Sequence, residues 1–336
     1  MQITLQNIFT ASLLFSQVFC ENGLYSRFDE WVREFRVKFH SGNDYESTFL
    51  KWVSNHKYIE YVNSMNLSYT LGHNAYSGMN LTEFKGKMTT TFDYEQHNAN
   101  RYQFPSYSTL PTSVNWVDVG AVTQVKDQGQ CGSCWSFSTT GALEGVFYNK
   151  FGKLVSFSEQ QLVDCDTLRN GGHDHGCNGG LMDNAFQWIH TNGGLCEESS
   201  YVYVSGKTQK SGSCVTTCEL VDGSIVAKYV DVPPHSDYEM MSAITFQPVS
   251  IAIEADTREF QLYKSGVFDA ECGTNLDHGV LVVGYGTLDG KDYYLIKNSW
   301  GSSWGQNGYI LLGRGYSYNN GDGQCGMLLQ GSYPVL

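Results

Sequence analysis

The chain has 336 residues, of which 41% are hydrophobic and 14% are aromatic, a composition that argues against a disordered chain and allows a sizeable core. Its 34 acidic and 21 basic side chains give a net charge of −13, which makes nucleic acid and anionic membrane surfaces poor partners. Ten cysteines are typical of a protein that folds in an oxidising compartment.

The N-terminus carries an apolar segment. Residues 8–20 read IFTASLLFSQVFC, which is the length of a signal-peptide apolar region and too short to span a bilayer. We interpret residues 1–20 as a signal peptide cleaved after Cys20; the alternative is a buried strand or helix near a folded N-terminus. No other stretch approaches membrane-spanning length, so we expect no membrane partner. Without Cys20, the remaining cysteines would suffice for one reactive thiol and four pairs.

Residues 24–63 have helical periodicity. The segments LYSRFDEWVREFRVKF and ESTFLKWVSNHKYIEYVN both place apolar side chains at three-to-four spacing. Residues 89–110 are polar, lack this periodicity and contain Pro105. They therefore indicate an exposed connector, the kind of segment where proteolysis concentrates.

A different pattern follows Pro111. Residues 135–150 are predicted to form a helix, and strand-like runs separated by Gly and Asp follow at 250–253, 280–285, 293–297 and 309–312. Helices first and strands later predict an α+β body with two halves. Residues 110–336 hold 24 of the 34 acidic side chains. Because carboxylates lose charge on acidification, this body should repel itself less in an acidic compartment.

Two cysteines form a Cys-x-x-Cys arrangement in QGQCGSCWSF. Cys131 and Cys134 have three interpretations: a redox dithiol, a structural cysteine beside a catalytic one, or two disulfide cysteines without chemistry. The predicted helix would put Cys134 at a helix N-terminus, where unpaired N–H groups and the helix dipole lower a thiol pKa. A thiolate attacks carbonyl carbons, and the departing amine then needs a proton donor.

Candidates for the supporting roles lie on both sides of Cys134. His278, in LDHGV, is the candidate proton donor, and Asn298, in KNSWG, would orient its imidazole through an amide oxygen. Trp300 would cover that hydrogen bond. Gln128 offers a side-chain N–H₂ that, with the Cys134 backbone N–H, would bind a developing oxyanion. Each residue alone is more often structural, and their joint occurrence is what indicates nucleophilic catalysis.

At these residues the sequence resembles the papain family of cysteine proteases, in particular its cathepsin L-like members. The resemblance rests on GAVTQVKDQGQCGSCWSFS, SEQQLVDC, GCNGGLMDNAF, LDHGVLVVGYG and KNSWGSSWGQNGYI, in the family's order and spacing. It implies a papain-like α+β fold of two domains, with a helical left half that carries Cys134, a β-barrel-like right half that carries His278 and Asn298, and the active-site cleft between them. A mainly helical inhibitory pro-domain should precede this fold.

The resemblance also implies an activity, the hydrolysis of peptide bonds by a cysteine endopeptidase. Cys134 would be the nucleophile in an ion pair with protonated His278, Asn298 would orient His278, and Gln128 would complete the oxyanion hole. Neither a cofactor nor a metal is implied. The competing hypothesis is a thiol–disulfide oxidoreductase that cycles Cys131 and Cys134. A catalytically silent relative is disfavoured because all four catalytic positions are filled.

Substrate-binding positions carry over from the family. Gly179 and Gly180 would offer backbone hydrogen bonds to an extended peptide. Gln330 would form a polar, uncharged floor in the otherwise apolar pocket for P2, the second side chain before the scissile bond. Trp304 would be a hydrophobic platform on the leaving-group side. The full set is Gly179, Gly180, Leu181, Met182, Ala252, Leu276, Asp277, Gly279, Trp300, Trp304 and Gln330.

Eight cysteines are expected to pair. The resemblance, together with the extra cysteines of this chain, gives Cys131–Cys177, Cys272–Cys325, Cys165–Cys214 and Cys196–Cys218, and the last two pairs could be exchanged. The loop that separates Cys165 from Cys177 is enlarged. Its His173 and His175 are interpreted as exposed residues rather than metal ligands.

The N-terminal part resembles the inhibitory propeptide of cathepsin L-like proteases. Residues 55–63 match the end of the family's interrupted helical signature, and residues 72–76 partly match the next motif. Gly78 stands where an Asp is usual, which puts in doubt any inherited acid trigger that relies on that carboxylate. The propeptide should lie along the cleft and keep the enzyme latent.

These expectations divide the chain into a signal peptide (1–20), an inhibitory propeptide (21–109) and a peptidase domain (110–336). Asn66 and Asn80 lie in glycosylation sequons within the propeptide. The expected partners are protein and peptide substrates, the chain's own propeptide and cystatin-like inhibitors. A lysosomal or secreted location follows from the signal peptide, and a monomer is the default state.

Overall fold

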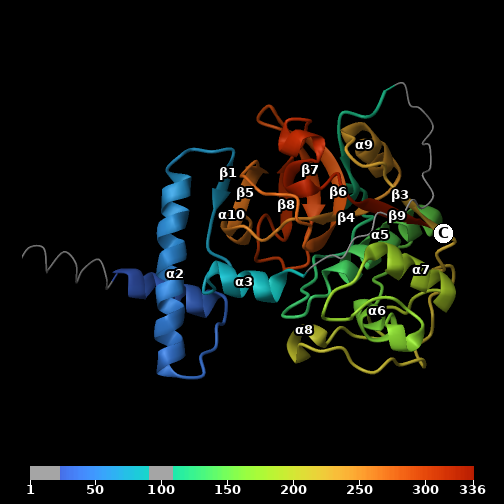
Figure 1. Ribbon diagram of the computed structural model, residues 1–336, viewed down its shortest axis with the longest axis horizontal. Helices are drawn as coiled ribbons and strands as arrows, with labels where there is room; N and C mark the ends of the chain where they lie inside the picture. The colour runs from blue at the N-terminus through green and yellow to red at the C-terminus, as the bar shows by residue number, and fades with distance from the viewer. Residues whose placement is uncertain (1–22, 91–108) are drawn as a thin grey trace, which may run out of the picture.

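The computed structural model describes residues 23–90 and 109–336. Figure 1 shows three parts: a pro-domain dominated by the long helix α2, a sheet-rich half in orange and red, and a helix-rich half in green. The predicted signal peptide 1–20 and most of the predicted connector 89–110 lie outside the described residues.

The pro-domain is built on two helices, as the periodicity of residues 24–63 predicts. Helical residues 23–34 and α2 (Gly42–Asn63) pack through an aromatic cluster of Phe28, Trp31, Phe49 and Trp52. The strand β1 (Tyr69–Leu71) and the helix α3 (Leu81–Met88) follow. Asn80 and Glu83 form a capping box that starts α3 by satisfying two backbone N–H groups.

The helical half surrounds α5 (Cys134–Phe151). Most of α5 is buried, because apolar and small side chains face its neighbours on nearly every side. The predicted helix 135–150 is therefore confirmed. The other elements of this half are β2 (Val114–Asn115), α4 (Trp116–Val119), α6 (Glu159–Cys165), η1 (Leu168–Asn170), α7 (Met182–Asn192) and α8 (Ser205–Thr208).

The second half is organised around a sheet. The elements are β3 (Lys228–Asp231), α9 (Asp237–Phe246), β4 (Val249–Ile253), α10 (Arg258–Gln261), β5 (Tyr263–Phe268), β6 (His278–Leu288), β7 (Lys291–Lys297), β8 (Tyr309–Gly313), η2 (Tyr318–Gly321), η3 (Gln324–Gly326) and β9 (Gly331–Val335). The four predicted strands correspond to β4, β6, β7 and β8. The β6–β7 hairpin turns at Asp289 and Gly290, whose φ angles of 50° and 79° are those that a two-residue hairpin requires.

The sheet is open. Its strand order is β1-β5-β8-β7-β6-β4-β9-β3, with β2 added to β6, and within the described residues no pairing joins the two ends. The expected β-barrel-like right half is therefore wrong in its closure. The physical reason is that β5, the edge strand of the second half, pairs with β1 of the pro-domain, so its backbone groups are satisfied without closing a barrel.

Four disulfides are formed, in the pairs named from the sequence: Cys131–Cys177, Cys165–Cys214, Cys196–Cys218 and Cys272–Cys325. The first three tie the loops of the helical half, including the enlarged loop, and the fourth lies in the second half. Within the described residues, Cys134 is the free cysteine.

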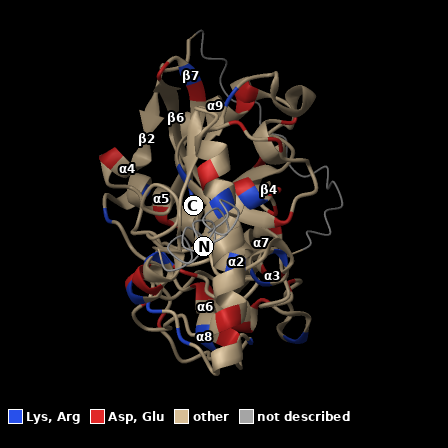
Figure 2. Cartoon of the chain, turned by 90° about the vertical axis from the view of Figure 1, so that its left-hand side faces the viewer, with Lys and Arg blue, Asp and Glu red and all other residues tan. Residues whose placement is uncertain are grey.

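The pro-domain docks on the second half. Beside the β1–β5 pairing, Gly72 N–H donates to Leu262 O (2.8 Å), and Lys85 forms an ion pair with Asp256 (2.7 Å). Seen from the side of α2, acidic and basic residues are interspersed, and neither sign gathers into one patch (Figure 2). Among residues 23–90 and 109–336, no helix is both long enough and apolar enough to cross a membrane.

Candidate active site

Cys134 opens α5 and is completely buried. The N–H groups at this helix start surround its sulfur, and the backbone of Gly279, the residue after His278, also hydrogen-bonds it. Gly279 leaves room for this contact, because a Cβ at this position would come 3.2 Å from the Trp135 nitrogen and 3.3 Å from the Cys134 carbonyl carbon. The thiol of the helical half therefore touches the start of β6.

His278 is the first residue of β6, and Asn298 follows the last residue of β7, its hairpin partner. The strand pairing brings both side chains together, and His278 Nε2 lies 2.7 Å from Asn298 Oδ1. The Trp300 ring stacks on the imidazole with centroids 4.5 Å apart and is itself buried. The orienting and covering roles named from the sequence are thus compatible with this geometry.

Gln128 is buried next to the same residues. Its Nε2 donates to Cys131 O (3.0 Å), and its Oε1 accepts from Ser299 Oγ (2.7 Å). Ser299 N–H in turn donates to Asn298 Oδ1 (2.7 Å). Ser299 therefore links the predicted oxyanion donor to the residue that orients the imidazole.

In this form of the molecule burial favours the neutral forms of Cys134 and His278. Burial raises the pKa of the Cys134 thiol to about 12, against the opposing effect of the Gly279 and helix N–H groups. Burial also lowers the pKa of His278 to about 4, although its hydrogen bond to Asn298 opposes this. His278 Nδ1 is buried without a hydrogen-bond partner. In this form burial therefore opposes the expected thiolate–imidazolium pair and outweighs the effect of the helix N-terminus on the thiol pKa.

The pro-domain covers this site through the residues after α3. Thr90 N–H donates to Asp277 O (2.8 Å), and Thr90 Oγ1 donates to Asn178 O (3.3 Å). Asp277 precedes His278, and Asn178 precedes Gly179, so Thr90 bridges the two halves beside Cys134. A Cβ on Gly179 would come 2.7 Å from Thr90 Oγ1, which explains why the backbone can approach so closely there.

The predicted substrate-binding residues fall in two groups. Gly179, Gly180, Leu181 and Met182 form the entry into α7 in the helical half. In the second half, Ala252 pairs with Gly279 across β4 and β6 and donates its N–H to Gln330 O (3.1 Å), while Leu276 and Asp277 lead into β6.

Trp304 does not form an exposed platform in this form. It is completely buried, and its indole N–H donates to Phe260 O (3.2 Å). Its neighbour Trp300 is contacted by pro-domain rings, with Phe84 at a centroid distance of 5.2 Å and Tyr76 at 5.9 Å. The pro-domain therefore packs on the aromatic cluster to which Trp304 belongs.

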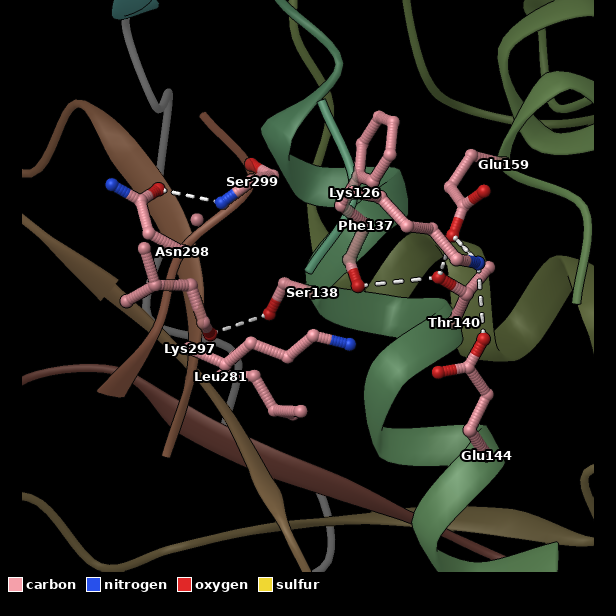
Figure 3. A pocket seen from close by; sticks show the side chains of 12 residues that line it. Lys126, Phe137, Ser138, Thr140, Glu144, Glu159, Leu281, Lys297, Asn298 and Ser299 are labelled. Atoms are coloured by element: carbon pink, nitrogen blue, oxygen red, sulfur yellow. Dashed lines mark hydrogen bonds and ion pairs between the residues drawn. The ribbon is translucent and has the colours of Figure 1, made fainter. Parts of the chain in front are cut away.

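A buried charge network connects the two halves behind the site (Figure 3). Lys126 Nζ lies 3.1 Å from Glu144 Oε1 and 2.5 Å from Glu159 Oε1, and these carboxylates raise its pKa despite burial. Lys297, which precedes Asn298, donates to Thr123 Oγ1 (2.9 Å), and burial lowers its pKa to about 8. The network borders a cavity of about 20 Å³, large enough for one water molecule. It anchors the end of β7 from which Asn298 projects.

Sequence reasoning missed two residues of the site. Ser299 could have been found, because it stands directly after Asn298 in KNSWG. Thr90 could not, because its place beside Asp277 and Asn178 depends on how the pro-domain docks. The structure gives His173 and His175 no metal-ligating cluster within the described residues.

Two protein-family models match this chain. Residues 110–335 match the papain family cysteine protease model, and residues 28–84 match the cathepsin propeptide inhibitor domain (I29). The chain therefore belongs to the papain family of cysteine proteases and carries a cathepsin-type propeptide inhibitor domain.

Named relatives agree with this assignment. The chain is 43% identical over 296 positions to the probable cysteine protease RD21B of Arabidopsis thaliana (88% of this chain, 62% of that protein). It is 40% identical over 354 positions to the KDEL-tailed cysteine endopeptidase CEP2 of the same plant (98% and 93%). The chain spans only 62% of the length of RD21B and 59% of that of RD21A.

Solved structures of precursors are also similar. Recombinant stem bromelain precursor gives a TM-score of 0.84 at 36% identity, covering 94% of this chain and 99% of that one. The digestive procathepsin L 3 of Tenebrio molitor larval midgut gives a TM-score of 0.81 at 34% identity, covering 93% of this chain and 99% of that one.

The oxidoreductase hypothesis is wrong, since Cys131 is bonded to Cys177 and has no thiol to cycle with Cys134.

Proposed function

We propose that residues 110–336 form a cysteine endopeptidase that the preceding residues keep inactive. The observation that carries the proposal is the convergence of three side chains from separate elements: the free Cys134, His278, and Asn298 bound to His278 Nε2 at 2.7 Å. This hydrogen bond leaves Nδ1 as the nitrogen that exchanges a proton with Cys134.

The proposed reaction proceeds through an acyl-enzyme. Cys134 transfers its proton to His278 Nδ1, and the thiolate attacks the peptide carbonyl carbon. Gln128 Nε2 and the Cys134 N–H stabilise the oxyanion. His278 then gives its proton to the departing amine, which leaves a thioester. Water hydrolyses the thioester with His278 as the general base, and Cys134 is regenerated.

Latency follows from the same geometry. Thr90 occupies hydrogen-bonding positions on both halves, at Asn178 and Asp277, that an extended substrate would need. Cys134 and His278 are also completely buried in this form, and burial favours their neutral forms. Removal of the pro-domain would admit water and substrate together and lower the cost of forming the ion pair.

We propose a P2 preference for apolar side chains that Gln330 widens to polar ones. Met182 and Ala252 are completely buried and apolar, whereas Gln330 is 3% exposed and neither polar atom of its side chain has a partner. Leaving such a group unsatisfied costs about 1–3 kcal/mol, so a P2 side chain that hydrogen-bonds it would gain binding energy. Gln330→Leu should therefore narrow the preference to alkyl and aromatic P2 residues in a peptide-library cleavage profile.

The remaining sequence predictions belong to the same proposal. We take residues 1–20 as a signal peptide, 21–109 as the propeptide and Leu110 as the start of the mature enzyme. The four disulfides support a secretory route, with a lysosomal or secreted destination. We also propose glycosylation at Asn66 and Asn80 and recognition by cystatin-like inhibitors.

The test compares acid-treated preparations of the full precursor. The parent chain should process itself and cleave a fluorogenic peptide, and both Cys134→Ala and His278→Gln should lose these activities. His235→Gln is the matched control, because His235 lies on the surface in an ion pair with Asp322, and it should behave like the parent. Cleavage by a correctly folded Cys134→Ala protein would overturn the proposal.

A further inference from the structure

Two carboxyl groups are buried side by side beneath the substrate-binding segment of the helical half. Asp166 follows α6 and Asp174 lies in the enlarged loop, and their residues are 0% and 2% exposed. Each carboxyl group acts on the pKa of the other, which places the two close together. Because an ionised carboxylate only accepts hydrogen bonds, a direct hydrogen bond between them would require a proton on one of the two.

The Oδ1 atom of each carboxyl group accepts hydrogen bonds from neighbouring residues. Asp166 Oδ1 accepts from His173 N (3.1 Å). Asp174 Oδ1 accepts from Leu181 N (2.9 Å) and from Asn184 Nδ2 (3.1 Å). The backbone N–H of Asp174 also hydrogen-bonds the Asp166 carboxyl group. The Oδ2 atoms of Asp166 and Asp174 are buried and have no hydrogen-bond partner. A proton shared by the two carboxyl groups would satisfy these atoms.

Few charges face the pair from its surroundings. His175, on the same loop, acts electrostatically on Asp174 and lowers the pKa of that carboxyl group. Arg169 and Asp164 line the open pocket beside the loop, and Asp164 is already engaged by Tyr201 and Gly212. Burial raises the pKa of both Asp166 and Asp174, and in Asp166 the facing carboxylate adds to this effect.

The pair supports the backbone that meets a peptide in the cleft. A Cβ on Gly180 would come 2.7 Å from Asp174 Cγ and 2.6 Å from the Trp135 ring, so the segment rests directly on both side chains. The neighbouring Asn178 O already receives a hydrogen bond from Thr90 of the pro-domain. Any shift of Asp174 would release the Leu181 N–H and move residues 179–182.

We propose that Asp166 and Asp174 share one proton, and that this protonated pair is a positioning device that holds residues 179–182 in the conformation that binds the substrate backbone. The inference rests on the proposed endopeptidase function and assigns these residues a role in substrate binding, since neither touches Cys134 or His278. The proposal predicts that substrate affinity falls as pH rises, and that this fall does not depend on the titration of His278.

The direction of the pH effect follows from linkage. In an opened loop both carboxyl groups ionise in the usual acidic range, whereas the closed pair keeps its proton to higher pH. Each pH unit above that range therefore favours the opened loop by about tenfold, until the closed pair also loses its proton. Substrate affinity is highest at acidic pH and falls as pH rises, which appears as an increase in KM.

The decisive variant is Asp166→Asn. Its carboxamide has nearly the same shape, and its N–H₂ donates to Asp174 at every pH. In the processed enzyme, KM of the parent for one peptide substrate should rise from pH 5 to pH 8, by up to about tenfold per pH unit once the opened loop predominates. KM of Asp166→Asn should stay flat, while its kcat profile stays that of the parent. Arg169→Gln, an exposed change on the same loop, is the matched control and should keep the rise in KM.

Two results would overturn the proposal: an Asp166→Asn enzyme whose KM rises with pH as in the parent, or one whose kcat profile changes while KM does not. A second measurement does not depend on activity. Infrared spectra of the Cys134→Ala precursor at pH 7 should contain a protonated-carboxyl band that Asp166→Asn removes, and its persistence would contradict the shared proton. A parent enzyme that keeps this band but cleaves no peptide would instead contradict the proposed function alone.

Discussion

The pro-domain contains a pair of histidines that should make it unstable in acid. The rings of His56 on α2 and His73 after β1 both stack on Trp52, with centroid distances of 5.0 and 4.4 Å. His56 Nδ1 lies 3.0 Å from His73 Nε2, and Arg27 Nη1 lies 3.2 Å from His56 Nε2. We predict that protonation of this pair loosens the pro-domain and that His73→Gln shifts the loosening to lower pH.

The hydrogen-bond directions show why both rings are neutral. Arg27 can only donate, so His56 Nε2 accepts and His56 carries its proton on Nδ1. That proton is donated to His73 Nε2, which leaves the His73 proton on Nδ1, a buried atom without a partner. Glu60, 3.2 Å from His56 Nε2, favours a proton there, but such a proton would face Arg27. An added proton on either ring therefore breaks the chain of hydrogen bonds.

The magnitude comes from His73. Burial, with a smaller effect of His56, lowers its pKa from 6.5 to about 3. The unfolded pro-domain takes up the proton below pH 6.5 and the folded one does so only near pH 3, so stability is lost as pH falls through this window. At pH 5 the loss is about 2 kcal/mol, or roughly 30-fold in the opening equilibrium. Burial also lowers the pKa of His56, which acts in the same direction.

Loosening at His73 would be transmitted to the peptidase domain through the residues on either side of it, Gly72 and Asn74. Gly72 N–H donates to Leu262 O, and Asn74 Nδ2 donates to Gln261 O, so both flanking residues hold the pro-domain to α10 and its end. Arg258 of α10 also contacts α2, where it binds Asn55. His56 and His73 therefore lie next to the hydrogen bonds that dock the pro-domain on α10, so strain at these histidines would weaken the docking directly.

The assay uses the Cys134→Ala precursor, which cannot process itself. Protonated histidine quenches a stacked tryptophan, so Trp52 emission and hydrogen exchange of pro-domain amides are followed from about pH 7 to pH 4. The parent should open as pH falls below about 6, and His73→Gln should need more acid. His40→Gln is the control, because His40 is exposed in the same pro-domain. If His73→Gln opens at the pH of the parent, the histidine argument is refuted.

Three further outcomes are expected. Asn298→Ala leaves His278 Nε2 without its partner and should lower kcat/KM by roughly 10²-fold with little change in thermal stability, whereas an unchanged rate would remove Asn298 from the mechanism. Phe84→Ala deletes a completely buried ring that packs on Trp300, at a cost of about 3 kcal/mol, so alkylation of the precursor's free thiol should quicken by about 10²-fold; an unchanged rate would mean that this contact does not hold the cover. Lys126→Met leaves two buried carboxylates without their ion-pair partner and should cost about 3–5 kcal/mol in denaturant unfolding, and an unshifted midpoint would contradict the network.

Some of the fold was predictable because it depends on local pattern. The buried strands β4 and β6 are continuous apolar runs bounded by turn residues, and α5 is a long run of apolar and small residues between turn signals. The closure of the sheet was not predictable, because the edge is decided by β1, a three-residue strand too short to have a pattern of its own. The Asp166–Asp174 contact likewise depends on how the enlarged loop folds back over α6.

The protonation states of Cys134 and His278 were not predictable from the sequence either, because they depend on burial. Sequence places Cys134 at a helix N-terminus, an effect worth about 0.3–2 kcal/mol in favour of the thiolate. Burial acts in the opposite direction and dominates, and burial depends on how residues distant in sequence pack around Cys134. The reactivity of this thiol therefore depends on the packing around it as well as on its place in the helix. If acid loosens the pro-domain at His73, the change in burial at Cys134 would add to the titration of Cys134 and His278 themselves.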